Sequence, residues 1–187
     1  FVNTNFATGL GEGVVTWLNY SFRLLQLPVG VFGVAIGVAV LPPLTREIKK
    51  GDGTINDLVS STFMSSIEAV LWIMASCSLF LYLESTNIIS LLFGYGKFSL
   101  EDVMATSRAL KCFSFAAVGY GLIKVMTSFY YALDKTKFAM YVSVLSIFVN
   151  FISNYYLSQK IGYVGLALTS SLTLSLNAFI LFVIALS

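Results

Sequence analysis

The sequence contains no histidine, only two cysteines and three prolines, and few charges: 11% of its 187 residues are charged, and the net charge is +2. It also lacks the H-E-x-x-H, G-x-S-x-G and P-loop motifs, so we expect neither a common hydrolase site nor an ATP site. The basic residues are scattered, which excludes the basic patch of a nucleic-acid-binding protein. Cys77 and Cys112 lie in apolar stretches, which is typical of small buried side chains. We therefore expect a protein that is not an enzyme.

Long apolar stretches dominate the chain. Hydrophobic residues make up 57% of it, and the mean hydropathy is +0.85. A membrane-spanning helix needs about 20 mostly apolar residues. A soluble domain could bury one such helix, but it could not bury five. The sequence therefore predicts an all-α, polytopic transmembrane helix bundle, a single membrane region whose spans cover approximately 13–44, 56–83, 99–133, 137–158 and 163–187.

Both ends of the chain indicate a longer protein. Residues 1–10 have the character of the end of an earlier span, since glycines follow them closely. The chain begins at Phe1 without methionine and ends at Ser187 inside an apolar run. We therefore expect this chain to be a fragment, joined in the complete protein to further helices.

Helix start and stop signals divide the apolar stretches. Pro28 removes a hydrogen bond in the middle of the first full span, which predicts a kink. Pro42 and Pro43 are expected to end that span. Ser99 and Asp102 have the spacing of an N-cap followed by an acid in the first turn, which predicts the start of the third long span.

Small residues follow Pro28 at helical spacing. Gly30, Gly33 and Gly37 lie three and four residues apart, a pattern that allows helix backbones to approach closely in lipid. Close packing is the favoured interpretation. A hinge near Pro28 and Gly30 that serves alternating access is the alternative.

Arg23 lies about nine residues into its span, too deep to reach the near interface easily. Thr16, Asn19 and Gln26 share its helix face through spacings of three, four and seven residues. This polar stripe favours a wet cavity in which Arg23 meets an anionic substrate. A structural ion pair, a snorkelling arginine and hydrogen bonds to neighbouring helices are the alternatives.

Lys124 and Glu68 are the other deep charges. Each is costly in a membrane unless it is paired, and a cross-helix pair between them is conceivable at similar depth. Structural pairing and the lining of a substrate cavity are equally good interpretations of Lys124.

Amide and hydroxyl groups interrupt two later spans. Asn150 and Asn154 lie one turn apart, and Ser170 follows in the next span. Interhelical hydrogen bonds explain them without a ligand. With Asn3, however, they also supply the oxygens that a monovalent cation such as sodium needs.

Several runs together resemble one family of transporters. They are TNFATGLGEGVVTWLNYSFRLLQLPVGVFGVAIGVAVLPPLTR, FGYGKF, SRAL, LIKV, FYYALDKTK, NFISNYYL and GYVGLALTSSL. They closely resemble successive helices of the MurJ (MviN) family of bacterial lipid II flippases, within the multidrug, oligosaccharidyl-lipid and polysaccharide exporter superfamily. The R-L-x-x-L-P-x-G-x-x-G-x-A pattern that begins at Arg23 is the most specific part.

The resemblance implies fourteen helices in two lobes around a central cationic cavity, with helices seven to twelve, mainly the second lobe, present here. It implies that Arg23 meets the pyrophosphate of lipid II and that Thr16 faces the same cavity. A sodium site is implied at Asn3, Asn150, Asn154 and Ser170, where asparagine replaces an aspartate often found in the family. The family also commonly has an acid where Phe22 stands, so any ion pair of Arg23 at that position is missing.

The function that the resemblance implies is transport of lipid II outward across the bacterial inner membrane by alternating access, with an ion gradient or the membrane potential as the energy source. The expected substrate contacts are Arg23, Thr16, Asn19 and Lys124, and the expected partners are lipid II and membrane lipids. A related exporter of another lipid-linked polysaccharide or of drugs is the alternative. A structural or signalling protein with a degenerate transporter fold leaves the deep arginine unexplained.

Loop charges predict the orientation. One side carries more cations, and short loops rich in Lys and Arg are cytoplasmic. The cation-rich side contains Arg46, Lys49, Lys50, Lys135 and Lys137, and the opposite side contains Lys97 and Lys160.

We expect cysteines placed at Lys50 and Lys135 to be shielded from an impermeant thiol reagent in intact cells, because the cation-rich side faces the cytoplasm. A cysteine at Lys97 should react. The reverse labelling pattern would overturn the orientation.

Overall fold

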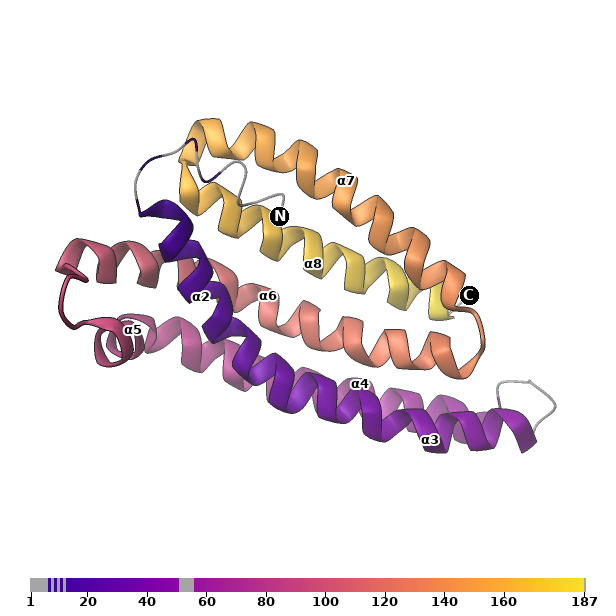
Figure 1. Cartoon of the computed structure of the whole chain (residues 1–187). Coiled ribbons are helices and arrows are strands. Elements are labelled where there is room, and N and C mark those ends of the chain that lie inside the picture. The colour runs from indigo at the N-terminus through magenta and orange to yellow at the C-terminus, as the bar shows by residue number, and fades with distance from the viewer. Residues whose placement is uncertain (1–6, 8, 10, 12, 51–55, 187) are drawn as a thin grey trace.

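The computed structural model describes residues 7, 9, 11, 13–50 and 56–186, and these form an all-helical bundle (Figure 1). Five helices within the described residues are long and apolar enough to cross a membrane, which confirms the predicted fold class. The first span is built from three consecutive segments. The elements are α2 (Val14–Pro28), η1 (Val29–Gly33), α3 (Val34–Lys50), α4 (Asp57–Leu83), α5 (Ser85–Phe93), α6 (Leu100–Ala132), α7 (Thr136–Ile161) and α8 (Tyr163–Leu186).

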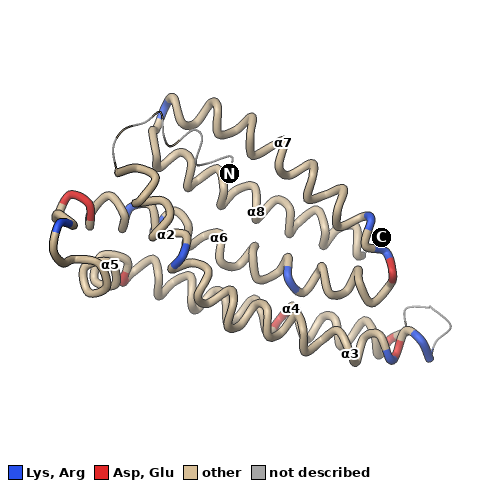
Figure 2. The backbone as a smooth tube through the Cα atoms, viewed as in Figure 1, with Lys and Arg blue, Asp and Glu red and all other residues tan. Residues whose placement is uncertain are grey.

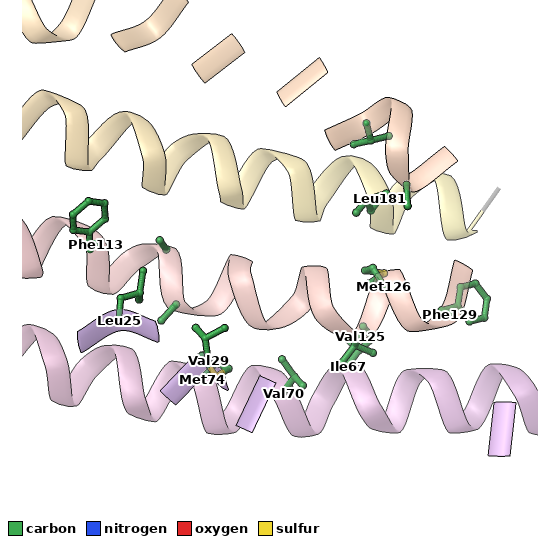
Figure 3. Close-up of a cluster of buried hydrophobic side chains, with 14 of the residues drawn as sticks. Leu25, Val29, Ile67, Val70, Met74, Phe113, Val125, Met126, Phe129 and Leu181 are labelled. Atoms are coloured by element: carbon green, nitrogen blue, oxygen red, sulfur yellow. The ribbon is translucent and has the colours of Figure 1, made fainter. Parts of the chain in front are cut away.

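Helix α6 is the central element of the bundle. It contacts every other helix described, whereas α7 packs chiefly on α8 and leaves most of its surface exposed. The buried side chains between α6 and its neighbours form a large apolar cluster, part of which is drawn in Figure 3, and a second, smaller cluster with α2 and α5. Met74 and Val70 reach α6 from α4, Leu25 and Val29 from the first span, and Leu181 from α8.

The first span bends at its proline and then continues beyond its expected end. A π-helical segment, Val29–Gly33, follows Pro28 directly, and α2 and α3 run in visibly different directions (Figure 1). The kink expected at Pro28 is therefore present. The expectation that Pro42 and Pro43 end the span was wrong, because α3 continues to Lys50.

Packing explains why α3 passes through two prolines. Pro42 and Pro43 lie on its exposed side, where their rings meet no neighbouring helix. Leu44 and Ile48, on the opposite side, are buried in the core. Burial of this apolar face offsets the two backbone hydrogen bonds that the prolines remove, so tertiary packing overrides local propensity.

Two of the three expected packing glycines lie against α6. A Cβ atom on Gly37 would lie 3.1 Å from the carbonyl oxygen of Lys124, and one on Gly33 would lie 3.3 Å from the Cα of Gly121. A Cβ atom on Gly30 would meet no atom within 4 Å. Close packing therefore accounts for Gly33 and Gly37, but not for Gly30.

The start of α6 has the predicted cap. The Ser99 side chain accepts from the backbone N–H of Asp102, and the Asp102 carboxylate accepts from the backbone N–H of Ser99, at 2.8 Å. This reciprocal pair satisfies two donors that the first helical turn leaves free.

Charged residues gather at the two ends of the bundle, and the middle of the helices carries few of them (Figure 2). The end of α3 and the α6–α7 turn lie at one end, and the α5–α6 and α7–α8 turns lie at the other (Figure 1). The loops therefore alternate between the two sides as the sequence predicted. Which end faces the cytoplasm stays a prediction.

We expect Gly119→Ala in the full-length protein to lower the free energy of unfolding by about 1 to 3 kcal/mol. A Cβ atom at Gly119 would lie 2.9 Å from the Cα of Ser175, so α6 and α8 would have to separate. Gly30→Ala is the control, because its Cβ meets nothing. Thermal unfolding in detergent measures both, and equal unfolding temperatures would contradict close α6–α8 packing at this point.

Candidate functional site: a polar cavity between four helices

A cavity of about 600 Å³ lies between α2, α6, α7 and α8. Aromatic and aliphatic side chains form part of its wall, including Phe22 of α2 and Phe113 of α6, whose rings meet edge to face. Polar side chains form the rest, and each of the four helices contributes at least one. They are Asn19, Lys124, Ser143, Ser146, Asn150, Ser170, Thr173 and Asn177.

Hydrogen bonds near the start of α2 fix the part of the cavity wall that α2 forms. The indole N–H of Trp17 donates to the Asp102 carboxylate at 2.8 Å, and its ring meets Tyr163 of α8 edge to face. The Ser21 hydroxyl shares its hydrogen between the carbonyl oxygen of Trp17 in its own helix, at 2.7 Å, and that of Thr106 in α6, at 2.8 Å. The first half of α2 is therefore anchored to both α6 and α8.

The polar stripe expected on α2 lies on its exposed side. Thr16, Asn19, Arg23 and Gln26 are all exposed, but only Asn19 lines the cavity. Within the described part of the chain, Arg23 has no hydrogen bond and no ion pair. The stripe therefore forms an open polar face beside the cavity and not its inner wall.

Lys124 lines the cavity from α6 and is half-buried. Its Nζ lies 5.5 Å from the centre of the Tyr120 ring, one turn earlier in the helix. The pair with Glu68 that similar depth made conceivable is not formed, because Glu68 is exposed on α4 and Lys124 faces the cavity. The charge of Lys124 is therefore held next to an aromatic face and has no carboxylate beside it among the described residues.

The asparagines of α7 are joined by hydrogen bonds. The amide of Asn154 donates to Oδ1 of Asn150 at 2.9 Å, and the amide of Asn150 donates to the Thr173 hydroxyl of α8 at 3.4 Å. The Ser170 hydroxyl donates to the carbonyl oxygen of Leu166 in its own helix. The structure thus brings Asn150 and Ser170 to one cavity and places Asn154 behind Asn150.

The oxygens of Asn150, Asn154 and Ser170 are the described members of the predicted sodium site. These neutral oxygens are of the type that a monovalent cation accepts, but Oδ1 of Asn150 already accepts from Asn154. A cation that used this oxygen would have to displace that bond. Asn3 lies outside the described residues. The sodium site therefore stays a prediction.

Four cavity residues were not predicted: Ser143, Ser146, Thr173 and Asn177. A signal for them was present, because polar residues at helical spacing mark one helix face. In α8, Ser170, Thr173 and Asn177 are separated by three and four residues; in α7, Ser143, Ser146 and Asn150 have the same separations. One polar stripe on each of two adjacent spans predicts that the stripes face each other.

Comparison with known proteins gives consistent matches over the whole chain. The profile of the family described as "Lipid II flippase MurJ" matches residues 1–186. The chain is 32% identical to the lipid II flippase MurJ of Burkholderia cenocepacia over 181 residues, which cover 97% of this chain and 34% of that protein. It is 30% identical to the probable lipid II flippase MurJ of Haemophilus influenzae, over 97% of this chain and 36% of that protein. The chain thus spans about a third of the length of the curated relatives it matches.

Solved structures share the fold. A structure of lipid II flippase MurJ in an inward closed conformation superposes with a TM-score of 0.89 at 22% identity, over 100% of this chain and 39% of that chain. An outward-facing multidrug resistance transporter of the MATE family superposes with a TM-score of 0.80 at 14% identity, over 96% of this chain and 38% of that chain. Both superpositions show a shared arrangement of helices.

We expect the double variant Asn150→Leu with Asn154→Leu, in the full-length protein, to abolish any sodium dependence of transport, because it removes both amide oxygens from α7. Transport measured with sodium and with choline checks this. Asn87→Leu, at an exposed position of α5, is the matched control. If sodium stimulates the double variant as much as the parent, these oxygens serve only helix packing.

Proposed function

Because this chain belongs to the MurJ family of lipid II flippases, we propose that it forms part of a protein that moves lipid II outward across the bacterial inner membrane. The family consists of transporters and not of enzymes, and the chain is a multi-pass membrane protein of the inner membrane. Lipid II is a peptidoglycan precursor linked to an undecaprenyl pyrophosphate, so a path for it must accept an anionic group. Alternating access of two lobes carries it across.

The exposed polar face of α2 is the observation that supports this proposal. Arg23 lies about 14 Å along the helix from Val14, at the rise of 1.5 Å per residue, so its charge lies well inside the span. A charge at this depth, exposed and with no ion pair within the described part of the chain, needs a wet or anionic neighbour. Thr16 and Asn19 extend this face, and Lys124 adds a second cation in the adjoining cavity.

We propose that an ion gradient or the membrane potential supplies the energy. The sequence contains no P-loop for ATP. A single charge that crosses the membrane in a potential of 100 mV contributes about 2.3 kcal/mol, a useful driving force for a transporter.

A related exporter of another lipid-linked polysaccharide or of drugs is the second candidate. The shared fold with a MATE family transporter, at a TM-score of 0.80, is the observation in its favour. Cationic drugs, however, require an acidic path, and the cavity has no Asp or Glu among its described lining residues. The lipid II proposal is therefore favoured.

We expect function in the full-length protein to fall in the order Arg23, Arg23→Lys, Arg23→Ala. A guanidinium binds a pyrophosphate through two parallel hydrogen bonds, whereas lysine offers a point charge and alanine offers neither. Loss of one charge-assisted contact costs about 1.5 to 3 kcal/mol, or roughly ten-fold to a hundred-fold in affinity. Complementation of a strain depleted of its flippase, together with lipid II translocation, measures the effect.

Arg108→Ala is the matched control for this series, since Arg108 is also an exposed arginine but lies on α6 and not on the polar face of α2. Protein levels are measured in parallel to separate folding from transport. If Arg23→Ala accumulates normally and restores growth and translocation like the parent, Arg23 is not a required substrate contact.

A further inference from the structure

The cavity between α2, α6, α7 and α8 has an uncompensated positive charge. Lys124 is the only charged residue among the described residues that line it, and no ion pair of Lys124 is formed within the described ranges. An ammonium group in a largely apolar, membrane-embedded site is costly unless an opposite charge accompanies it. The Tyr120 ring offsets a part of this cost, since its face attracts cations.

Asn177 is the second unusual group of this cavity. It is 6% exposed and lines the cavity from α8, yet its Oδ1 is buried without a hydrogen-bond partner among the described residues. A buried carbonyl oxygen that accepts no hydrogen bond typically costs about 1 to 3 kcal/mol. Such a cost is tolerated where a ligand or its water of hydration completes the bonding.

Lys124 and Asn177 lie at a similar level on neighbouring helices. Helices α6 and α8 touch at Gly119 and Ser175, where a Cβ atom on Gly119 would lie 2.9 Å from the Cα of Ser175. Lys124 lies five residues beyond that contact and Asn177 two residues beyond it, which is about 8 Å and 3 Å along the two helix axes. Both side chains line the same cavity, which has room for a small ligand.

The hydroxyl groups of the cavity do not compete for this ligand. Ser143, Ser146, Ser170 and Thr173 each donate their hydrogen to a carbonyl oxygen four residues earlier in their own helix. Among the described lining residues, Lys124 carries the one formal charge, and Oδ1 of Asn177 is a buried acceptor to which no described group donates. A cavity with one ammonium group and no Asp or Glu among its described lining residues favours an anion.

We propose that a small monovalent inorganic anion of the halide class, with chloride as its probe, binds between Lys124 and Asn177. One ammonium matches one negative charge, whereas a divalent phosphate or sulfate would leave an unbalanced charge in an apolar site. The amide N–H groups of Asn177 donate to the anion, and a water in its hydration shell donates to Oδ1.

This site goes beyond lipid transport and affects cations in the same cavity. Asn150 and Ser170 line it together with Lys124, so an unneutralised ammonium repels any cation near their oxygens. A bound anion removes this repulsion. The occupancy of the anion site therefore sets how readily a cation enters the cavity.

The test is the line broadening of chloride-35 NMR by the purified full-length protein in a non-ionic detergent, with choline as the cation and no lipid II. We expect saturable broadening that bromide suppresses and that sulfate does not. Lys124→Met should weaken the apparent affinity at least about ten-fold, because it removes the charge. Lys124→Arg should retain binding, and Asn177→Leu should weaken it several-fold.

Lys111→Met is the matched control. Lys111 is also half-buried on α6 and lies 5.9 Å from the centre of an aromatic ring, that of Tyr82, but it does not line the cavity. This variant should bind chloride like the parent. Equal broadening in the parent and in Lys124→Met, suppression by sulfate rather than bromide, or no saturable broadening in the parent would each overturn the proposal. If Lys124→Met does not fold, unchanged binding in Asn177→Leu overturns it.

Discussion

Close backbone contact with α6 is the constraint on which the rest of this structure depends. Lipid tails are as apolar as the side chains, so the hydrophobic effect does not drive helices together in a membrane. The helices associate through van der Waals contacts and hydrogen bonds, and both require short distances. Gly119 lets α8 approach α6, Gly121 receives Met74 of α4, and Gly37 lies against the backbone of α6. Because these contacts lie on different sides of α6, this helix can be surrounded by neighbours. Helix α7 lacks such a contact with α6 and is held mainly by α8. The cavity lies on the side where α7 stands away from the centre.

Most hydroxyl groups that line the cavity form their hydrogen bonds within their own helix. Serine and threonine hydroxyls that donate to the preceding turn satisfy their hydrogen without help from another helix. The burial of these hydroxyl groups in a membrane therefore costs little free energy. This explains how α7 and α8 carry polar stripes while they remain helical. Lys124 and Asn177 have no such local solution. Their placement in the same cavity makes the cavity a site for a ligand and not only a packing defect.

The sequence predicted most of the fold because lipid imposes long apolar helices, and the Ser99 and Asp102 cap followed from local spacing alone. It failed at Pro42 and Pro43, since the burial of an apolar face on the other side of α3 cannot be recognised from proline chemistry. The conceivable pair of Lys124 with Glu68 is also not formed, because depth along a span does not say which side of a helix a residue faces. Asn177 was overlooked although its spacing from Ser170 places both on one face. Which residues meet across helices depends on the contacts of α6, and these are not a local property of the chain.

The first span joins two halves, α2 and α3, and both are held against α6. Gly33 and Gly37 lie against the α6 backbone, and Trp17 and Ser21 hold α2 by hydrogen bonds to α6. Between them lie Pro28, which donates no backbone hydrogen bond, and a π-helical turn in which a Cβ on Gly30 would meet no neighbour. A helix that is held on both sides of a weak segment bends there, because less packing opposes the change in angle. Within this span, the residues that line the cavity all belong to α2. A bend at this segment therefore moves one wall of the cavity while the α3–α6 contact stays in place.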